Sequence, residues 1–207
     1  MHVYFVRHGE TVLNSKHIHQ SPNTPLSPKG REGIVTLAEA LRGVNPSIIL
    51  SSEYTRALES ARIIGSRVGL SPITNGLFYE IIRPSKFFLK SIFSPETFWY
   101  VFQSMMHRNK ASWRYADAEN FVEVSNRAKK ALQYLESLRE NHSSVVVVSH
   151  TVFINIMVSY MCKDRLLDIR DLFLTFFHIE KMKNGEVIHM EYVGDGSART
   201  CNWRRVS

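Results

Sequence analysis

Apolar residues recur along the chain in two patterns, short continuous runs and stripes at helical spacing. The short runs are rich in β-branched residues, one with four consecutive valines, and they predict strands buried on both faces. We expect such strands at residues 1–6, 46–51, 71–77 and 143–149. Stripes with apolar residues three or four apart predict amphipathic helices. These helices are expected at residues 28–41, 54–68, 119–139 and 152–161.

The order of these elements predicts the fold class. Strands that alternate with helices are typical of an α/β protein, in which a mainly parallel sheet lies between two layers of helices. Near the C-terminus, residues 172–180 and 186–193 flank the turn Lys183-Asn184-Gly185 and predict a β-hairpin. We therefore expect a three-layer α/β/α fold with a mainly parallel central sheet and a C-terminal β-hairpin.

The composition changes between residues 86 and 118, where aromatic side chains gather. They are Phe87, Phe88, Phe93, Phe98, Trp99, Tyr100, Phe102, Trp113 and Tyr115. Ser94 and Pro95 begin a predicted helix that extends to Arg108. We interpret residues 86–118 as a helical cap insertion over the strand ends, within a single domain of residues 1–207. We expect its aromatic side chains to form a packed core, with ligand contacts as the alternative, and we expect substrate selectivity to arise in this segment.

Composition and charge narrow the class of protein. The 207 residues are 44% hydrophobic and 22% charged, which is typical of a soluble globular protein. A net charge of +7 favours anionic partners. Its basic residues are scattered, and the densest run, Arg199, Arg204 and Arg205, is interpreted as a solvated tail, so nucleic-acid binding is not expected. We expect no signal peptide and no membrane span, and hence a cytoplasmic protein.

The cysteine content fits that compartment. Cys162 and Cys201 are the two cysteines, and they form neither a CxxC motif nor a disulfide framework. Such usage is consistent with a reducing cytosol. Because Cys162 lies in an apolar helical stretch, we expect it in the core.

Arg7 and His8 directly follow the first predicted strand. The carboxyl end of a strand is where open α/β sheets bind ligands. A neutral imidazole is a competent nucleophile near neutral pH, and a guanidinium holds phosphate oxygens with two donors. Gly9 is expected to allow a tight turn after His8. An Arg-His pair on its own is more often an exposed surface feature.

Further polar groups are expected at the same sheet edge. Arg56 lies in the first turn of a predicted helix, where its guanidinium and the free amides of the helix can converge on an anion. His150 ends the valine-rich strand and reaches the edge that carries His8. Glu80 lies among apolar neighbours, and burial would favour the protonated form that a general acid requires.

Five motifs in the same order resemble the histidine phosphatase superfamily, the phosphoglycerate-mutase-like enzymes. They are Arg7-His8-Gly9-Glu10-Thr11 with Asn14, Pro25-Leu26-Ser27-Pro28-Lys29-Gly30, Ser51-Ser52-Glu53-Tyr54-Thr55-Arg56-Ala57, Glu80, and Val148-Ser149-His150. The resemblance implies that His8 is the nucleophile and Glu80 the proton donor. The residues that it implies for phosphoryl binding are Arg7, Asn14, Arg56 and His150. Arg83-Pro84-Ser85 resembles the phosphatase branch.

The chain differs from the family pattern at Thr151, where the family usually has Gly. A threonine at this position would be strained if the backbone required a positive φ. Alternatively, Thr151 caps a helix that begins at residue 152.

The resemblance implies a metal-independent phosphomonoesterase that acts on a small phosphorylated metabolite through a phosphohistidine intermediate, without a cofactor. The alternatives are a phosphoglycerate-mutase-type phosphotransferase, a phosphoprotein phosphatase and a catalytically silent phosphate-binding protein.

His17 and His19 lack nearby cysteine or acidic partners, so we interpret them as exposed loop residues and not as metal ligands. No oligomeric state is predicted.

Overall fold

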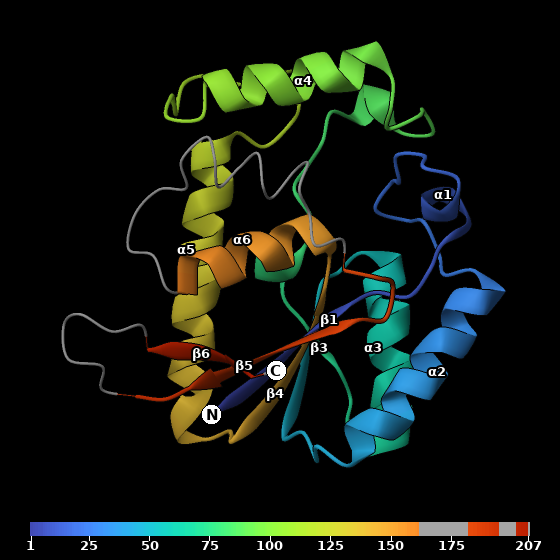
Figure 1. Cartoon of the computed structure of the whole chain (residues 1–207), viewed down its shortest axis with the longest axis vertical. Helices are drawn as coiled ribbons and strands as arrows, with labels where there is room; N and C mark the ends of the chain where they lie inside the picture. Colours follow the sequence, from blue (N-terminus) through green and yellow to red (C-terminus); the bar gives the residue numbers. More distant parts are fainter. Residues whose placement is uncertain (162–181, 195–201, 207) are drawn as a thin grey trace.

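A computed structural model describes residues 1–161, 182–194 and 202–206 (Figure 1). Its six strands are β1 (His2–Arg7), β2 (Ile48–Ser51), β3 (Ile73–Thr74), β4 (Ser144–Ser149), β5 (Val187–Tyr192) and β6 (Trp203–Val206). They form one sheet in the order β3-β2-β4-β1-β5-β6. The first four strands of this order are parallel to one another, whereas β5 is antiparallel to β1 and to β6. The prediction of an α/β fold with a mostly parallel sheet is confirmed.

The helices follow the expected stripes to within a few residues. They are α1 (Val12–Ser15), α2 (Pro28–Arg42), α3 (Thr55–Val68), α4 (Pro95–Met106), α5 (Phe121–Ser137) and α6 (Thr151–Met161). Ser27 caps α2, since its hydroxyl accepts the amide of Gly30 at 3.0 Å, and Pro28 is the first helical residue. The short helix α1 was not predicted. The strand expected at 71–77 is only the two residues of β3, followed by a 3₁₀ turn at Gly76–Phe78.

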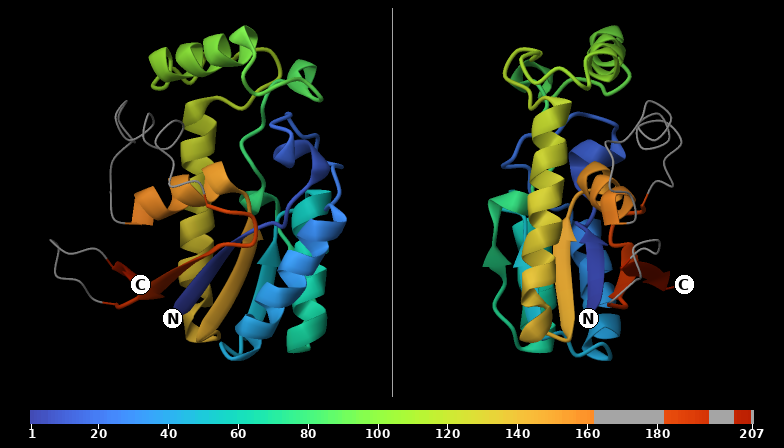
Figure 2. Two further views of the ribbon diagram at one scale, coloured as in Figure 1. Left: turned by 45° about the vertical axis from the view of Figure 1, so that its right-hand side comes forward. Right: turned by 90° about the vertical axis from the view of Figure 1, so that its left-hand side faces the viewer.

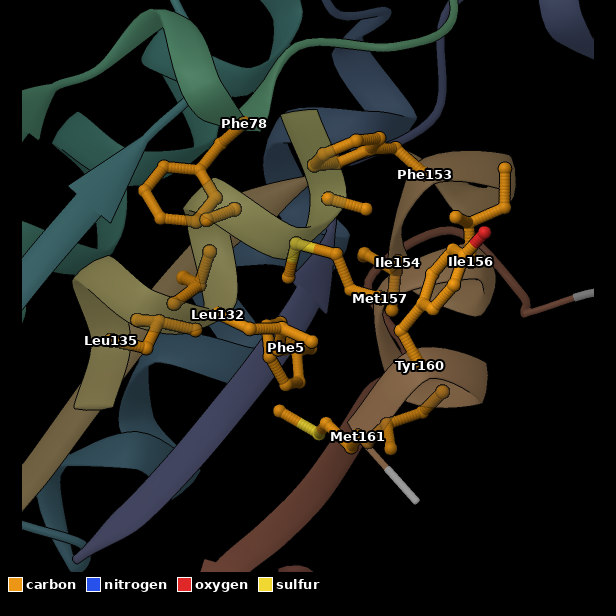
Figure 3. Packing of buried hydrophobic residues seen from close by; sticks show 14 of the residues in the cluster. Phe5, Phe78, Leu132, Leu135, Phe153, Ile154, Ile156, Met157, Tyr160 and Met161 are labelled. Carbon is orange, nitrogen blue, oxygen red and sulfur yellow. The ribbon is translucent and has the colours of Figure 1, made fainter. Parts of the chain in front are cut away.

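Two layers of helices cover the two faces of the sheet (Figures 1 and 2). Side chains alternate along a strand, so Phe5 and Val6 of β1 lie in different cores. Val6 packs with Ile34 of α2 and Ile64 of α3. On the other face, Figure 3 shows Phe5 close to residues of α5 and α6, including Leu132, Leu135 and Met157. The three-layer arrangement follows directly from this alternation.

The C-terminal part differs from the prediction. The arm expected at 172–180 lies outside the described residues, as do Cys162, Cys201 and Arg199. The other arm is confirmed as β5, which pairs with the central strand β1. Arg204 and Arg205 belong to the edge strand β6, so they are not part of a tail, although both are exposed to solvent. The apolar residue of this strand, Trp203, is buried, which explains why the segment pairs with the sheet.

Residues 86–118 lie at the end of the molecule toward which the parallel strands run, with α4 across the top (Figures 1 and 2). Phe87 and Tyr100 are buried in a small core of their own, separate from the two cores of the sheet. The expected packing of all the aromatic side chains is wrong for four of them. Phe93, Phe98, Trp99 and Phe102 are about half exposed, at 58%, 48%, 55% and 52%. They are exposed because the small core of Phe87, Tyr100 and Ala118 packs against only one side of α4.

Glycine is required where α2 approaches the loop after β1. Gly9 does not have a positive φ, so the glycine is not required there for a left-handed backbone conformation. The reason is instead close backbone contact: a Cβ on Gly9 would lie 2.6 Å from the carbonyl oxygen of Gly30, and a Cβ on Gly30 would lie 2.1 Å from that of Glu10. The two glycines thus let the helix press against the loop that carries His8.

This close contact predicts opposite effects of alanine at two glycines of α2. Gly30→Ala is expected to lower the free energy of unfolding by about 1–3 kcal/mol, because backbone must move to accept the methyl group. Gly33→Ala meets nothing within 4 Å and is expected to raise it by about 0.5–1 kcal/mol. Urea unfolding of both variants checks the pair. Equal effects would contradict the close-contact explanation.

Candidate active site

A pocket of about 410 Å³ lies at the carboxyl edge of the sheet. Adjacent parallel strands β1 and β4 end in register, with Arg7 opposite Ser149, so the residues that follow them become neighbours. His8 and His150 are those residues, and their ring centroids are 5.1 Å apart. Of the expected site residues, Arg7, His8, Asn14, Arg56 and Glu80 line the pocket. His150 is fully buried directly behind it, between Tyr54 and His8.

Hydrogen bonds fix the protonation state of His8. Arg56 Nε donates to His8 Nε2 at 3.2 Å, and a guanidinium can only donate, so Nε2 is the unprotonated nitrogen. The proton is therefore on Nδ1, which donates to the carbonyl oxygen of Gly9 at 2.7 Å. Burial, together with the charges of Arg56 and Arg7, lowers the pKa of His8 well below its usual 6.5. The imidazole is thus held neutral, with its lone pair at Nε2.

Two buried arginines surround this imidazole. Arg56, in the first turn of α3, is 4% exposed and also donates from Nη1 to the carbonyl oxygen of Ser21 at 3.0 Å. Burial lowers its pKa to about 10, so it stays charged at neutral pH, and the carboxylate of Glu80 opposes the shift. Arg7 donates from Nη1 to the carbonyl oxygen of Met182, while its buried Nε has no partner among the described residues. The two guanidinium groups make the pocket strongly electropositive.

His150 and Thr151 present further polar atoms. Ser52 accepts the amide of Tyr54 at 3.2 Å and lies 2.9 Å from Nε2 of His150. The hydroxyl can donate its own hydrogen to Nε2, and in this arrangement the proton of a neutral His150 is on Nδ1. Nδ1 is buried and has no partner among the described residues. Burial, with the charge of Arg56, lowers the pKa of His150 well below 6.5.

At Thr151 the condition for strain is not met, and the expected helix cap is wrong. Its φ is not positive, so there is no strain, and α6 begins at this residue, so it is not the cap. Thr151 lines the pocket, and its buried hydroxyl has no partner among the described residues. Ser52 and Thr151 were not predicted as polar neighbours of the pocket, although their positions offered a signal: Ser52 directly follows β2, and Thr151 follows His150 at the end of β4.

Glu80 is half-buried, and its Oε1 is fixed by two backbone amides. It accepts from Ile81 and from Phe153, each at 3.1 Å. Within the described residues, the second oxygen, Oε2, has no hydrogen-bond partner. The expected burial among apolar neighbours is therefore incomplete, because the carboxyl group borders the pocket.

Asn14 lies at the pocket within a chain of amides. Its Oδ1 accepts from Thr11, and its Nδ2 donates to Oδ1 of Asn184 at 2.8 Å. Asn184 in turn donates to the carbonyl oxygen of His8 at 3.1 Å. Asn184 was expected only as a turn residue, and its place in the pocket arises from the pairing of β5 with β1.

The interpretation of His19 as an exposed residue is wrong, whereas His17 is exposed. His19 is 3% exposed and stacks on Phe87, with ring centroids 5.6 Å apart. Its Nε2 lies 3.0 Å from the hydroxyl of Thr97, and its Nδ1 lies 3.2 Å from Nη1 of Arg83. Nothing in the loop sequence indicates this burial, because the covering residues come from 86–118.

Within the described residues, no group of three or more His, Cys, Asp or Glu side chains forms a metal site.

The lowered histidine pKa values predict a loss of stability in acid. Burial and the charge of Arg83 lower the pKa of His19 to about 4. Below pH 6.5 the unfolded chain binds protons that the folded chain does not, so the free energy of unfolding falls as the pH decreases toward 4. We expect His19→Gln to make this dependence shallower, by at most about 1.4 kcal/mol per pH unit. Urea unfolding between pH 7 and 4.5 measures the two slopes, and identical slopes would contradict the assignment.

An α/β sheet edge that brings two neutral imidazoles and several guanidinium groups to one pocket defines a phosphate-handling enzyme site. The chain belongs to the histidine phosphatase superfamily (branch 1), whose profile matches residues 3–200. The protein named probable phosphoglycerate mutase GpmB from Erwinia tasmaniensis is 27% identical over 164 residues, which are 77% of this chain and 74% of that protein. These matches place the chain among phosphoryl-transfer enzymes.

Solved structures share the fold over nearly the whole chain. A mycobacterial glucosyl-3-phosphoglycerate phosphatase is similar with a TM-score of 0.76 and 22% identity, covering 99% of this chain and 96% of that chain. The alpha-ribazole phosphatase of Shigella flexneri has a TM-score of 0.73 and 18% identity, covering 100% of this chain and 96% of that chain. None of the described helices is long and apolar enough to cross a membrane.

Proposed function

We propose that the protein is a metal-independent phosphomonoesterase that acts on a small phosphorylated metabolite through a phosphohistidine intermediate. The single observation that carries the proposal is the state of His8: a buried, neutral imidazole with its unprotonated Nε2 toward Arg56 and its Nδ1 fixed by Gly9. This is the state a histidine nucleophile requires, because protonation would remove the attacking lone pair.

In the first step, Nε2 of His8 attacks phosphorus in line with the departing oxygen. The N–P bond forms as the P–O bond to the leaving group breaks, and Glu80 gives its proton to the leaving alkoxide. Nδ1–H of His8 carries the positive charge that develops on the ring, and the carbonyl oxygen of Gly9 stabilises it. Arg56, whose Nε holds Nε2 in the free protein, transfers this hydrogen bond to a phosphoryl oxygen.

The charge on the phosphoryl group is neutralised by side chains. Arg7 Nε, His150 Nδ1 and the Thr151 hydroxyl are buried polar atoms without partners among the described residues, and each can donate to an oxygen. With Arg56 and Asn14 they form the phosphoryl site. Such preorganised donors stabilise the spreading charge of the transition state, and no step in this scheme requires a metal.

Hydrolysis of the intermediate completes the cycle. Glu80, now a carboxylate, takes a proton from water as the water oxygen attacks phosphorus, and the N–P bond breaks to return its electron pair to Nε2 of His8. Phosphate leaves, and Glu80 is protonated again.

We also propose that residues 86–118 form a cap that restricts the site to small substrates, since Phe88 and Ile92 line the pocket.

A mutase is the second candidate, and the GpmB name of the sequence relatives favours it. A mutase returns the phosphoryl group to an isomer of the substrate and releases little phosphate. The phosphatase neighbours and the Arg83-Pro84-Ser85 segment favour hydrolysis.

The expectations that the protein is cytoplasmic and binds no nucleic acid stay predictions.

The test is phosphate release from p-nitrophenyl phosphate and from a panel of phosphorylated metabolites, with EDTA present. Interconversion of 2- and 3-phosphoglycerate is assayed in parallel. We expect phosphate release that chelation does not change. Isomerisation without phosphate release would establish the mutase instead, and phosphate binding without any turnover would establish a silent binding protein.

A further inference from the structure

Arg83 is the third arginine that lines the pocket, beside Arg7 and Arg56. It is half-buried. Its contact among the described residues is Nη1 to Nδ1 of His19, and no carboxylate lies at ion-pair distance within that part of the chain. Arg127, by contrast, is buried away from the pocket and paired with Glu119 through two hydrogen bonds of 2.9 and 2.7 Å. Among the described residues, no carboxylate thus neutralises the charge of Arg83.

The neighbour of Arg83 orients the guanidinium without offsetting its charge. Arg83 can only donate, so Nδ1 of His19 accepts, and Nε2–H of His19 donates to the hydroxyl of Thr97. Since the pKa of His19 is about 4, the ring is neutral at physiological pH. His19 is buried against Phe87, which restricts its motion. A guanidinium held in this way loses little conformational entropy when it binds an anion.

The pocket has more positive charge than one phosphoryl group requires. Arg7, Arg56 and Arg83 line it, and among the described lining residues Glu80 is the one carboxyl group. In its proton-donating state Glu80 is neutral, so three guanidinium charges face a phosphate dianion. One further negative charge on the substrate would balance them. The positive charge of Arg83 also lowers the pKa of Arg56, in addition to the larger effect of burial, so the two groups repel each other until an anion binds.

We propose that Arg83 forms a second anion subsite, which binds a carboxylate or second phosphate elsewhere on the phosphomonoester substrate. This inference rests on the proposed function. The substrate class is therefore a phosphomonoester with at least one additional negative charge. Its body lies against the apolar lining of Ile82, Phe88 and Ile92, so it is compact and partly apolar.

The test compares competitors of p-nitrophenyl phosphate hydrolysis that differ in one group. 3-Phosphoglycerate and glycerol 3-phosphate share a carbon skeleton, and a carboxylate in the first replaces a hydroxymethyl group in the second. Glycerol 1,3-bisphosphate places a second phosphate on the same skeleton and retains the C2 hydroxyl. The wild type is compared with Arg83→Gln, with Arg83→Lys and with the control Arg62→Gln, which removes an exposed positive charge of α3 outside the pocket.

We expect the wild type and Arg62→Gln to bind 3-phosphoglycerate or the bisphosphate about 10- to 100-fold more tightly than glycerol 3-phosphate. Arg83→Gln should remove most of this ratio, and Arg83→Lys should restore part of it, because lysine keeps the charge without the planar fork. The compound with the larger ratio identifies the second group. Equal inhibition by all three compounds in the wild type, or an equal loss for all three in Arg83→Gln, would overturn the proposal.

Failure of the proposed function gives a different result. If the wild type hydrolyses no phosphomonoester, the phosphatase proposal is wrong, and the same three compounds are then titrated by calorimetry. A binding preference for the two compounds with a second anionic group that depends on Arg83 would still support the subsite. No such preference would overturn it.

Discussion

Replacing His8 with alanine is expected to lower the turnover of p-nitrophenyl phosphate by about 10⁴-fold or more. The nucleophile has no substitute in the pocket, because His150 is fully buried and its Nε2 faces Ser52. The other phosphate donors remain, so the variant should still bind inorganic phosphate. Turnover and phosphate affinity are therefore expected to separate in this one variant.

The measurement combines steady-state turnover with a rapid quench in base. Phosphohistidine is expected in the wild type and not in His8→Ala. The matched control is His142→Ala, since His142 lies just before β4, at the opposite end of this strand from the pocket, and should leave turnover unchanged. A His8→Ala protein that is folded and retains a tenth or more of wild-type turnover would show that His8 is not the nucleophile.

Replacing Arg127 with methionine is expected to lower the free energy of unfolding by about 3–5 kcal/mol. Its ion pair with Glu119 is buried, with side-chain exposures of 9% and 8%. The variant leaves the carboxylate of Glu119 desolvated and without its charged partner. Arg127 also donates to the carbonyl oxygens of Leu77 and Tyr79, at 3.2 and 2.8 Å, so it fixes the segment that leads into Glu80.

The double variant Glu119→Gln with Arg127→Met separates the two contributions. Removing both charges should recover part of the lost stability, because no unpaired charge stays buried. Both variants are nevertheless expected to have a lower kcat, since Glu80 loses its support, with a smaller change in KM. Urea unfolding and steady-state kinetics measure these effects. A double variant with a lower free energy of unfolding than Arg127→Met would contradict this account.

Much of the site could be predicted because strand ends are visible in the sequence. The apolar runs before His8 and His150 end abruptly in polar residues, and parallel strands bring such ends to one edge. The motif resemblance then connected Arg56, Glu80 and Asn14 with the same edge. The burial of His19 was not predicted, because its cover comes from the distant residues 86–118. The position of Thr151 was also wrong, since this residue begins a helix and its hydroxyl lies at the pocket.

The sequence by itself determined the order of strands and helices, the family and the residues that follow strand ends, because periodicity and local polarity are properties of neighbouring positions. Only the tertiary structure decided the state of each group. The sequence neighbours of Arg83 and Arg127 do not reveal the partners of these two arginines, yet Glu119 neutralises Arg127, and a neutral His19 orients Arg83. Partners of this kind come from separate segments, and burial sets which of them is charged, so only packing distinguishes the neutralised Arg127 from Arg83, at which we propose the second anion subsite.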